Sequence, residues 1–203
     1  QGVSSAASDV YKRQVFPLGL VALPGSIQSL QIFEPRYINM VKECMSNGHG
    51  FIIVLQSKLE SISDYGMSKK GTYVEIIDFN NLPNGLLGIT VRSENKVNIS
   101  NICQLEDGLH VADAKPEIDP EVDDQAILAE YPEISNILTQ LMKHPRISDL
   151  QIKVDFSSAD SVAYNLAGLI PLSSFEKQNL LEAFDASQRM GILAKYIENI
   201  STT

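Results

Sequence analysis

Up to residue 115, apolar and polar residues alternate in short runs that predict β-strands. In 29–33 (SLQIF), a two-residue period places Leu30 and Ile32 on one face, whereas 51–56 (FIIVLQ) is apolar almost throughout, as expected for a strand covered on both sides. Further strands are predicted at 71–79, 86–92, 96–100 and 109–113, with a turn over 80–85 (NNLPNG). Short strands separated by turns indicate a small barrel or sandwich.

One helix is predicted inside this β region. Glu34 is expected at the N-cap and Pro35 at the first helical position, where the fixed φ of proline suits a helix and its missing N–H has no intrahelical partner to lose. Apolar residues then recur at helical spacing, and a glycine follows where a left-handed turn ends a helix. These residues are Tyr37, Met40, Val41 and Cys44, followed by Gly48.

From residue 117 the apolar period becomes helical, so we predict an α+β fold with a β-barrel over 15–116 and an α-helical bundle over 117–203. The acidic stretch 116–125 (PEIDPEVDDQ) is the expected junction. Ser173 with Glu176, and Asp185 with Gln188, have capping-box spacing. The apolar stripes are Ile134, Ile137, Leu138 and Leu141; Val162, Leu166, Leu169 and Ile170; Leu180, Leu181 and Phe184; and Met190, Leu193, Ile197 and Ile200.

The first residues do not follow these patterns. Residues 1–14 (QGVSSAASDVYKRQ) have no initiator methionine and no periodicity, so we expect a tag or artefact outside the fold. The stretch that follows has the basic pair and short apolar run of a secretory signal, but Pro17, Gly19 and Pro24 interrupt it. No stretch approaches the ~20 apolar residues of a membrane span, and we expect a cytoplasmic protein.

The charge of the chain argues against anionic partners. Of the net charge of −9, residues 15–115 contribute −2, from 8 Lys/Arg and 10 Asp/Glu, and residues 116–203 contribute −8, from 6 and 14. An acidic surface repels phosphate groups. We therefore expect neither nucleic acid nor a membrane as a partner.

The cysteines and histidines form no recognisable metal or catalytic motif. Cys103 stands alone, and Cys44 falls on the apolar stripe of the first helix, where a small core residue is expected. His110 is expected to face solvent from a strand, and His144 to mark a helix end; the third histidine is His49. No metal and no cofactor are therefore predicted.

A phosphate-binding loop is also rejected. Gly66 and Gly71 have the separation of the G-x-x-x-x-G-K-[ST] pattern, but Thr72 stands at the lysine position. The segment also leads into a predicted strand, whereas the motif requires a helix whose amides point at phosphate. We expect a loop before a strand.

The stretch 32–37 (IFEPRY) combines two opposite charges with aromatic side chains at the strand-to-helix corner. In a structural interpretation, Glu34 caps the helix and Arg36 bonds a carboxylate or loop carbonyls. In a binding interpretation, Phe33 and Tyr37 line a groove. No catalytic residue is predicted, and these four residues are the candidates for a binding site or a structural corner.

Three blocks of sequence are specific enough to indicate a family. The pattern P-L-x-L-x-x-x-P-G begins at Pro17, I-F-E-P-R-Y spans 32–37, and P-L-S-x-x-E-K-Q-x-L-L-E spans 171–182. Together with the hairpin region 71–99, they resemble the N-terminal substrate-binding domain of the ATP-dependent Lon proteases over residues 15–200. This resemblance implies a PUA-like pseudo-β-barrel with one embedded helix, followed by an α-helical bundle.

In the Lon proteases this domain recognises unfolded or tagged protein substrates, while ATP hydrolysis and Ser-Lys proteolysis occur in later domains that this chain lacks. The resemblance therefore implies a non-catalytic protein-binding module of protein quality control. Its implied partners are unfolded or tagged polypeptide segments and a protease or chaperone machine. The corner residues Phe33, Glu34, Arg36 and Tyr37 become the candidate polypeptide-binding site.

The form of the IFEPRY block looks like that of stand-alone bacterial Lon-domain proteins, so we expect a stand-alone protein. Two alternatives stay open: the recognition fragment of a longer ATP-dependent serine protease, and a structural protein that docks through its acidic helical bundle. The family often has a basic-aromatic strand after the hairpin. Here SENKVNI has Lys96 as its only basic residue, which argues against a charge-based substrate contact there.

Overall fold

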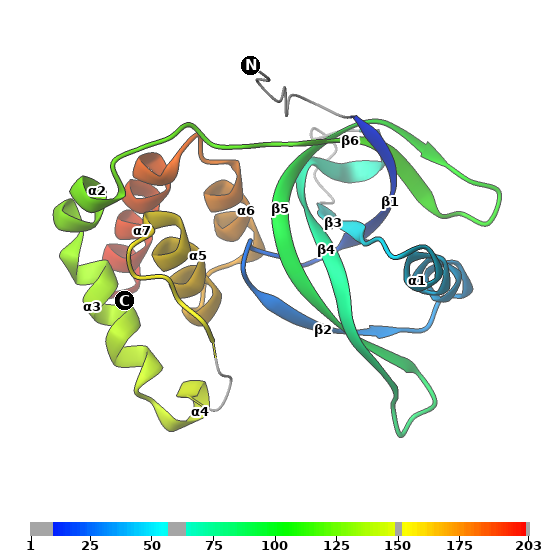
Figure 1. Cartoon of the computed structure of the whole chain (residues 1–203), viewed down its shortest axis with the longest axis horizontal. Coiled ribbons are helices and arrows are strands. Elements are labelled where there is room, and N and C mark those ends of the chain that lie inside the picture. The colour runs from blue at the N-terminus through cyan, green and yellow to red at the C-terminus, as the bar shows by residue number, and fades with distance from the viewer. Residues whose placement is uncertain (1–9, 57–63, 149–151, 202–203) are drawn as a thin grey trace, which may run out of the picture. The chain divides into compact units, whose positions relative to one another are not determined.

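The computed structural model describes residues 10–56, 64–148 and 152–201 (Figure 1). The chain divides into two compact units, Gln1–Ile118 and Asp119–Thr203. In the described ranges, the first unit contains the strands and one α-helix, and the second contains only helices. The predicted α+β class, a barrel with an embedded helix followed by a helical bundle, is confirmed.

Six strands form one sheet in the first unit. They are β1 (Tyr11–Leu18), β2 (Ile27–Ile32), β3 (Phe51–Gln56), β4 (Met67–Asn81), β5 (Leu87–Gln104) and β6 (His110–Pro116). β1 pairs in parallel with β3 and antiparallel with β6, and β6 pairs in turn with β5. The strands β1, β3, β4, β5 and β6 therefore close into a barrel, and β2 lies along β5 as an added edge (Figure 1).

The strands β4 and β5 are longer than the sequence pattern indicates. The two strands predicted at 86–92 and 96–100 are one strand, β5, of 18 residues. Its first part pairs with β2 and its second part with β6. Register shifts between Thr72 and Val74 and between Ile76 and Asp78 interrupt its ladder with β4. Such bulges bend the strands and increase their twist, which suits one strand that serves two parts of a closed sheet.

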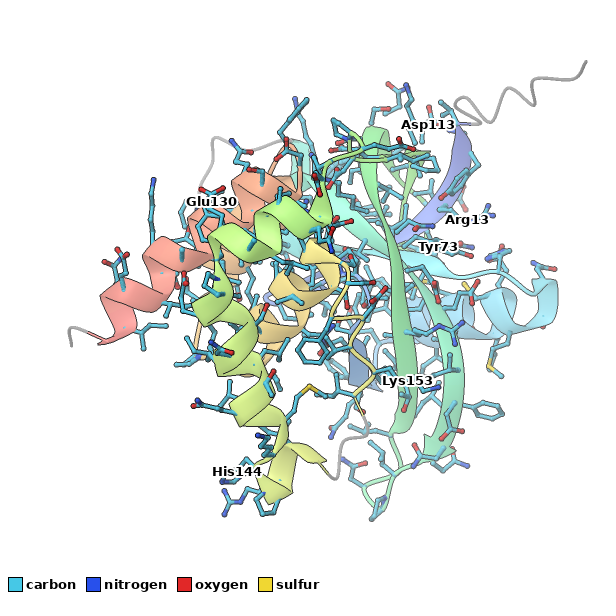
Figure 2. All side chains as sticks on the ribbon, turned by 60° about the vertical axis from the view of Figure 1, so that its left-hand side comes forward. Arg13, Tyr73, Asp113, Glu130, His144 and Lys153 are labelled. Atoms are coloured by element: carbon cyan, nitrogen blue, oxygen red, sulfur yellow. The ribbon has the colours of Figure 1, made fainter. Side chains whose placement is uncertain are left out.

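The barrel begins earlier than predicted, at Tyr11 instead of residue 15. The sequence pattern places residues 11–14 outside the fold, but they form the first half of β1. Of the first 14 residues, 1–9 lie outside the described part of the chain. Arg13 lies 4.6 Å above the Tyr11 ring, and Tyr11 meets Tyr73 edge-on at 6.5 Å (Figure 2). Lys12 donates to Asp113 of β6 at 2.9 Å. These contacts explain why residues without an apolar period are held in the sheet.

Successive residues of a strand point to opposite faces of the sheet, and here they pack into two different apolar clusters. This is expected for strands that are buried on both faces. In β3, Phe51 and Ile53 belong to one cluster, and Ile52 and Val54 belong to the other. Helix α1 (Pro35–Asn47) packs into the first cluster. Its buried residues are Tyr37, Met40, Val41 and Cys44, which confirms the predicted stripe.

Both ends of α1 follow the prediction in position. Glu34 is the N-cap residue, Pro35 begins the helix, and Gly48 ends it in the left-handed region with φ 66°. The Gly48 N–H donates to the carbonyl of Cys44. The Glu34 side chain makes no capping hydrogen bond, and its contacts are described with the site below.

The second unit consists of packed helices that proline residues and polar caps delimit. The helices are α2 (Asp124–Glu130), α3 (Pro132–Met142), α4 (Pro145–Ser148), α5 (Ala159–Leu169), α6 (Ser174–Glu182) and α7 (Ala186–Ser201). Ser173 and Glu176 form the predicted capping box. The predicted pair before α7 also bonds, since the Gln188 N–H donates to Asp185 at 2.8 Å. His144 lies between α3 and α4, at the predicted helix end (Figure 2).

The predicted apolar stripes identify the buried core of this unit, but two of their residues, Phe184 and Ile200, are exposed. Ile134, Leu138, Val162, Leu166, Leu180, Leu181, Met190 and Leu193 are buried. Phe184 and Ile200 are exposed instead, because α6 ends at Glu182 and Ile200 lies in the last turn of α7. None of the helices in the described ranges is long and apolar enough to cross a membrane.

A buried arginine joins the segments of the second unit. Arg189 of α7 is fully buried, and its guanidinium pairs with Asp119 at 2.7 Å and with Asp160 of α5. Its Nε donates to the carbonyl of Leu180 at 2.9 Å, and the group lies 4.5 Å from the Tyr164 ring centroid. One side chain thus holds the start of the unit, α5 and α6 against α7.

We expect Arg189→Met to destabilise the second unit by about 3–5 kcal/mol, because two carboxylates would lose a buried partner. The measurement is urea unfolding followed by helical circular dichroism. Lys195→Ala, an exposed change on the same helix, is the control and should stay within about 0.5 kcal/mol of the parent. A loss for Arg189→Met no larger than that of the control would contradict this account.

Candidate functional site

The candidate corner is built where β2 ends and α1 begins. Arg36 bonds Glu34 through both Nε and Nη2, at 2.8 and 2.7 Å, and its Nη1 donates to the carbonyl of Gly108 at 2.7 Å. This is the pairing with a carboxylate and a loop carbonyl that the structural interpretation predicts. The guanidinium also lies 4.7 Å from the Tyr37 ring centroid. The Glu34 carboxylate therefore orients Arg36 instead of capping the helix.

The two aromatic candidates occupy different environments. Tyr37 is buried, and its ring packs against Phe16 of β1 with centroids 4.1 Å apart. Phe33 is 65% exposed. Burial of a phenylalanine is worth roughly 1.5–3 kcal/mol, so an exposed one directly beside a pocket is the side chain of this corner with most to gain from a bound partner.

A pocket of about 210 Å³ opens at this corner. All four candidate residues line it, together with the end of β1, the end of β2, Gln56 of β3 and His110 of β6. We call it the corner pocket. Its apolar lining residues are Phe16, Pro17, Leu18, Ile32, Phe33 and Tyr37. The structure thus brings Phe33, Glu34, Arg36 and Tyr37 together around one concave site.

His110 is the unexpected member of the corner pocket. It is predicted to face solvent, but it is only 7% exposed. β6 buries His110 together with the small residues Ala112 and Ala114, and Leu109 just before the strand is buried as well. The His110 ring meets that of Tyr65 at 4.9 Å, and neither ring nitrogen has a hydrogen-bond partner among the residues that the structure describes. Burial and the charge of Arg36 lower the pKa of this imidazole.

The other candidates from the sequence have structural roles. Gly71 lies inside β4, where a Cβ would come within 2.5 Å of the Ile53 carbonyl oxygen. This close approach explains the glycine without any phosphate. Cys44 is fully buried beside the carbonyl of Gly50. Across the described residues, no three His, Cys, Asp or Glu side chains come together as metal ligands would.

Lys96 is also part of the architecture. It is 5% exposed and lies 3.3 Å from the Glu117 carboxylate, which accepts from Lys70 at 2.6 Å as well. The N–H of Glu117 donates to the carbonyl of Lys96 at 3.0 Å. A lysine held in this way fastens the chain after β6 to the barrel, so its charge is not presented to a substrate.

Sequence reasoning missed the pocket wall outside IFEPRY. Pro17 and Leu18 belong to the first specific block, so that block carried a signal for one side of the pocket. Gln31, Gln56 and His110 carried none, because they come together only through strand pairing.

The two cysteines should differ sharply in reactivity. Burial raises the pKa of the Cys44 thiol to about 11, and thiolate is the reactive form. We expect a thiol reagent at pH 7.5 to modify only exposed Cys103 in the folded chain and both cysteines after unfolding. Mass spectrometry of the labelled peptides gives the result, with Cys103→Ser as the control. Rapid labelling of Cys44 in the folded chain would contradict its burial.

The buried imidazole should make stability depend on pH. Because the folded chain holds His110 neutral more strongly than the unfolded chain does, unfolding takes up a proton once the pH falls below about 6.5. The free energy of unfolding should therefore decrease from pH 7.5 to pH 5.5. Urea titrations should show a shallower decrease for His110→Leu, whereas Phe79→Ala, an exposed change that removes no titratable group, should keep the decrease of the parent. Parallel curves for the parent and His110→Leu would refute this origin.

Comparison with known proteins identifies the family of this chain. The family model described as the ATP-dependent protease La (LON) substrate-binding domain matches residues 12–199. Lon protease of Haemophilus influenzae is 27% identical over 199 residues, and Lon protease 1 of Bacillus subtilis is 22% identical over 191 residues. The alignments cover 91% and 89% of this chain but 24% of each relative. The chain thus spans about a quarter of the length of these curated relatives.

Solved structures show the same fold. A Lon N-terminal domain protein from Xanthomonas campestris superposes with a TM-score of 0.72 and 26% identity, over 92% of this chain and 99% of that chain. The N-terminal domain of Mycobacterium avium complex Lon protease gives a TM-score of 0.68 over 92% and 97%, and at 16% identity this likeness concerns the fold alone. With the family model matched from residue 12 to residue 199, the chain belongs to the substrate-binding domain family of the ATP-dependent protease La (Lon).

Proposed function

We propose that this chain binds unfolded or tagged polypeptide segments at the corner pocket. The observation that carries the proposal is that the IFEPRY corner lines a concave, largely apolar site with one exposed aromatic residue, Phe33. Unfolded chains differ from folded ones in exposing apolar side chains, and a pocket with apolar walls recognises that difference. Membership of a substrate-binding domain family supports the same function.

The edge of β2 supports an extended ligand. Of the strands that the structure describes, β2 pairs only with β5. The Ser93 N–H donates to the Ser26 carbonyl at 2.9 Å, so the backbone of Ser26 faces β5. In an antiparallel ladder, every second residue directs its N–H and C=O groups to the partner strand. The N–H and C=O groups of Ile27, Ser29 and Gln31 therefore point away from β5. Such an edge can pair with an added strand, while a pocket at its end selects a side chain.

Capture of unfolded protein tests the proposal. Denatured test proteins should crosslink to the chain above the level of the same proteins in folded form. Phe33→Ala should reduce capture by about fivefold or more, the effect of losing a contact worth over 1 kcal/mol. Phe79→Ala, which removes a ring that is 55% exposed on β4 but not in the pocket wall, is the matched control. Equal capture by the parent and Phe33→Ala would count against the corner pocket.

Arg36→Ala separates binding from architecture. The ion pair with Glu34 is partly exposed, so its loss should cost at most about 1 kcal/mol of stability. A folded variant with weakened capture assigns Arg36 to binding. A destabilised variant with undiminished capture assigns it to the corner alone.

A second candidate is the recognition part of a longer ATP-dependent protease, which the greater length of the Lon relatives favours. The form of the IFEPRY block favours a stand-alone protein instead. The reading frame after Thr203 decides between them. A continuing frame that encodes G-x-x-x-x-G-K-[ST] establishes the protease, and a stop codon removes it.

A further inference from the structure

The inner wall of the corner pocket contains a polar side chain that its surroundings leave unsatisfied. His110 is more than nine-tenths buried, and its two ring nitrogens have no hydrogen-bond partner in the described part of the chain. A buried polar group without a partner is unfavourable, so such groups point to a ligand or a functional role. The Tyr65 ring contacts the imidazole but is not part of the pocket wall.

The electrostatics of the pocket favour a neutral ligand. Among its lining residues, only Glu34 and Arg36 carry a full charge, and they bond each other. The remaining N–H groups of Arg36 are directed in part to the Gly108 carbonyl. An ionic group entering the pocket would lose its hydration without gaining an unpaired counter-charge.

The size of the pocket corresponds to one aromatic side chain. An apolar cavity of ~150 Å³ holds a benzene molecule, and the corner pocket measures about 210 Å³. Its apolar lining, including Leu18, Ile32 and Phe33, supplies contact for the faces of a ring. The occupant therefore needs an apolar ring and one neutral polar atom that reaches His110.

We propose that the corner pocket binds a tyrosine side chain of the client polypeptide, with the ring against Phe33 and Leu18 and the hydroxyl hydrogen-bonded to His110. This assignment rests on the proposed function and names the side chain that the site selects. A neutral imidazole has one donor and one acceptor nitrogen, and a phenol hydroxyl both donates and accepts. Tyrosine therefore pairs with either tautomer. Phenylalanine has the same ring but leaves the imidazole unsatisfied.

Both ring nitrogens of His110 are buried in the structure, so the proposed hydrogen bond requires the imidazole to rotate toward the ligand. The χ2 angle of histidine has broad energy wells, so the ring can turn about the Cβ–Cγ bond without a change in the backbone. His110 is the first residue of β6, and Gln31 and Gln56 line the same pocket. Both glutamines are exposed and can bond the backbone that flanks the inserted tyrosine.

The test is a nuclear magnetic resonance titration of the intact chain with N-acetyl-tyrosinamide, N-acetyl-phenylalaninamide and N-acetyl-tryptophanamide. We expect the tyrosine amide to bind about five- to tenfold more tightly than the phenylalanine amide, the gain of one neutral hydrogen bond. The imidazole resonances of His110 should shift with the tyrosine amide. Equal affinities, tighter binding of the tryptophan amide, or an unperturbed His110 would overturn the assignment.

Variants extend the test. His110→Leu should bind both amides alike, whereas His49→Leu, a change outside the pocket wall, should keep the tyrosine preference. A tyrosine preference that persists in folded His110→Leu would overturn the assignment; should that variant not fold, the titration of the parent decides alone. Capture of denatured protein without any tyrosine preference would refute this inference and leave the proposed function intact. Selective tyrosine binding without capture would refute the proposed function instead.

Discussion

The parallel pairing of β1 with β3 is the constraint on which the first unit depends. Two neighbouring parallel strands cannot be joined by a tight turn, because the chain must run back to the end of the sheet at which the first strand began. Here β2 and α1 make that return, and α1 covers one face of the strands it connects. The strand-to-helix corner must then lie near the end of β1. The corner pocket is the space that this crossover leaves between Phe16–Leu18 and residues 33–37.

The chemistry of the site follows from the same arrangement. Pro35 begins the helix, and Arg36, held by Glu34 and by Gly108 of the loop before β6, closes the corner without presenting a free charge. What remains for a ligand is apolar surface, the amide groups of Gln31 and Gln56, and one imidazole. A site of this kind discriminates by shape and hydrogen bonding instead of by net charge. The proposed ligand, an unfolded segment, would offer such a site the apolar side chains that a folded protein keeps in its interior.

Local patterns were sufficient to predict elements but not their long-range partners. Pro35, the stripe from Tyr37 to Cys44 and Gly48 predict α1 correctly because each of these signals acts within a few residues. The merged strand β5 was missed because the ladders to β2 and β6, not local periodicity, keep it continuous. The burial of His110 was missed because Ala112 and Ala114, which share its face of β6, give only a weak apolar signal. The burial of Arg189 could not be predicted from local sequence either, because its partners lie up to 70 residues away along the chain.

The edge of β2 has a further consequence for the protein in solution. Natural sheets protect their edges with charged residues or proline, which hinder pairing with a second strand. The sequence of β2, IQSLQI, contains neither. The same backbone groups that would receive an extended client also match the edge of another copy of this chain. A second copy and the proposed client would therefore compete for this edge, and a higher protein concentration would favour the pairing of two copies over the proposed client binding.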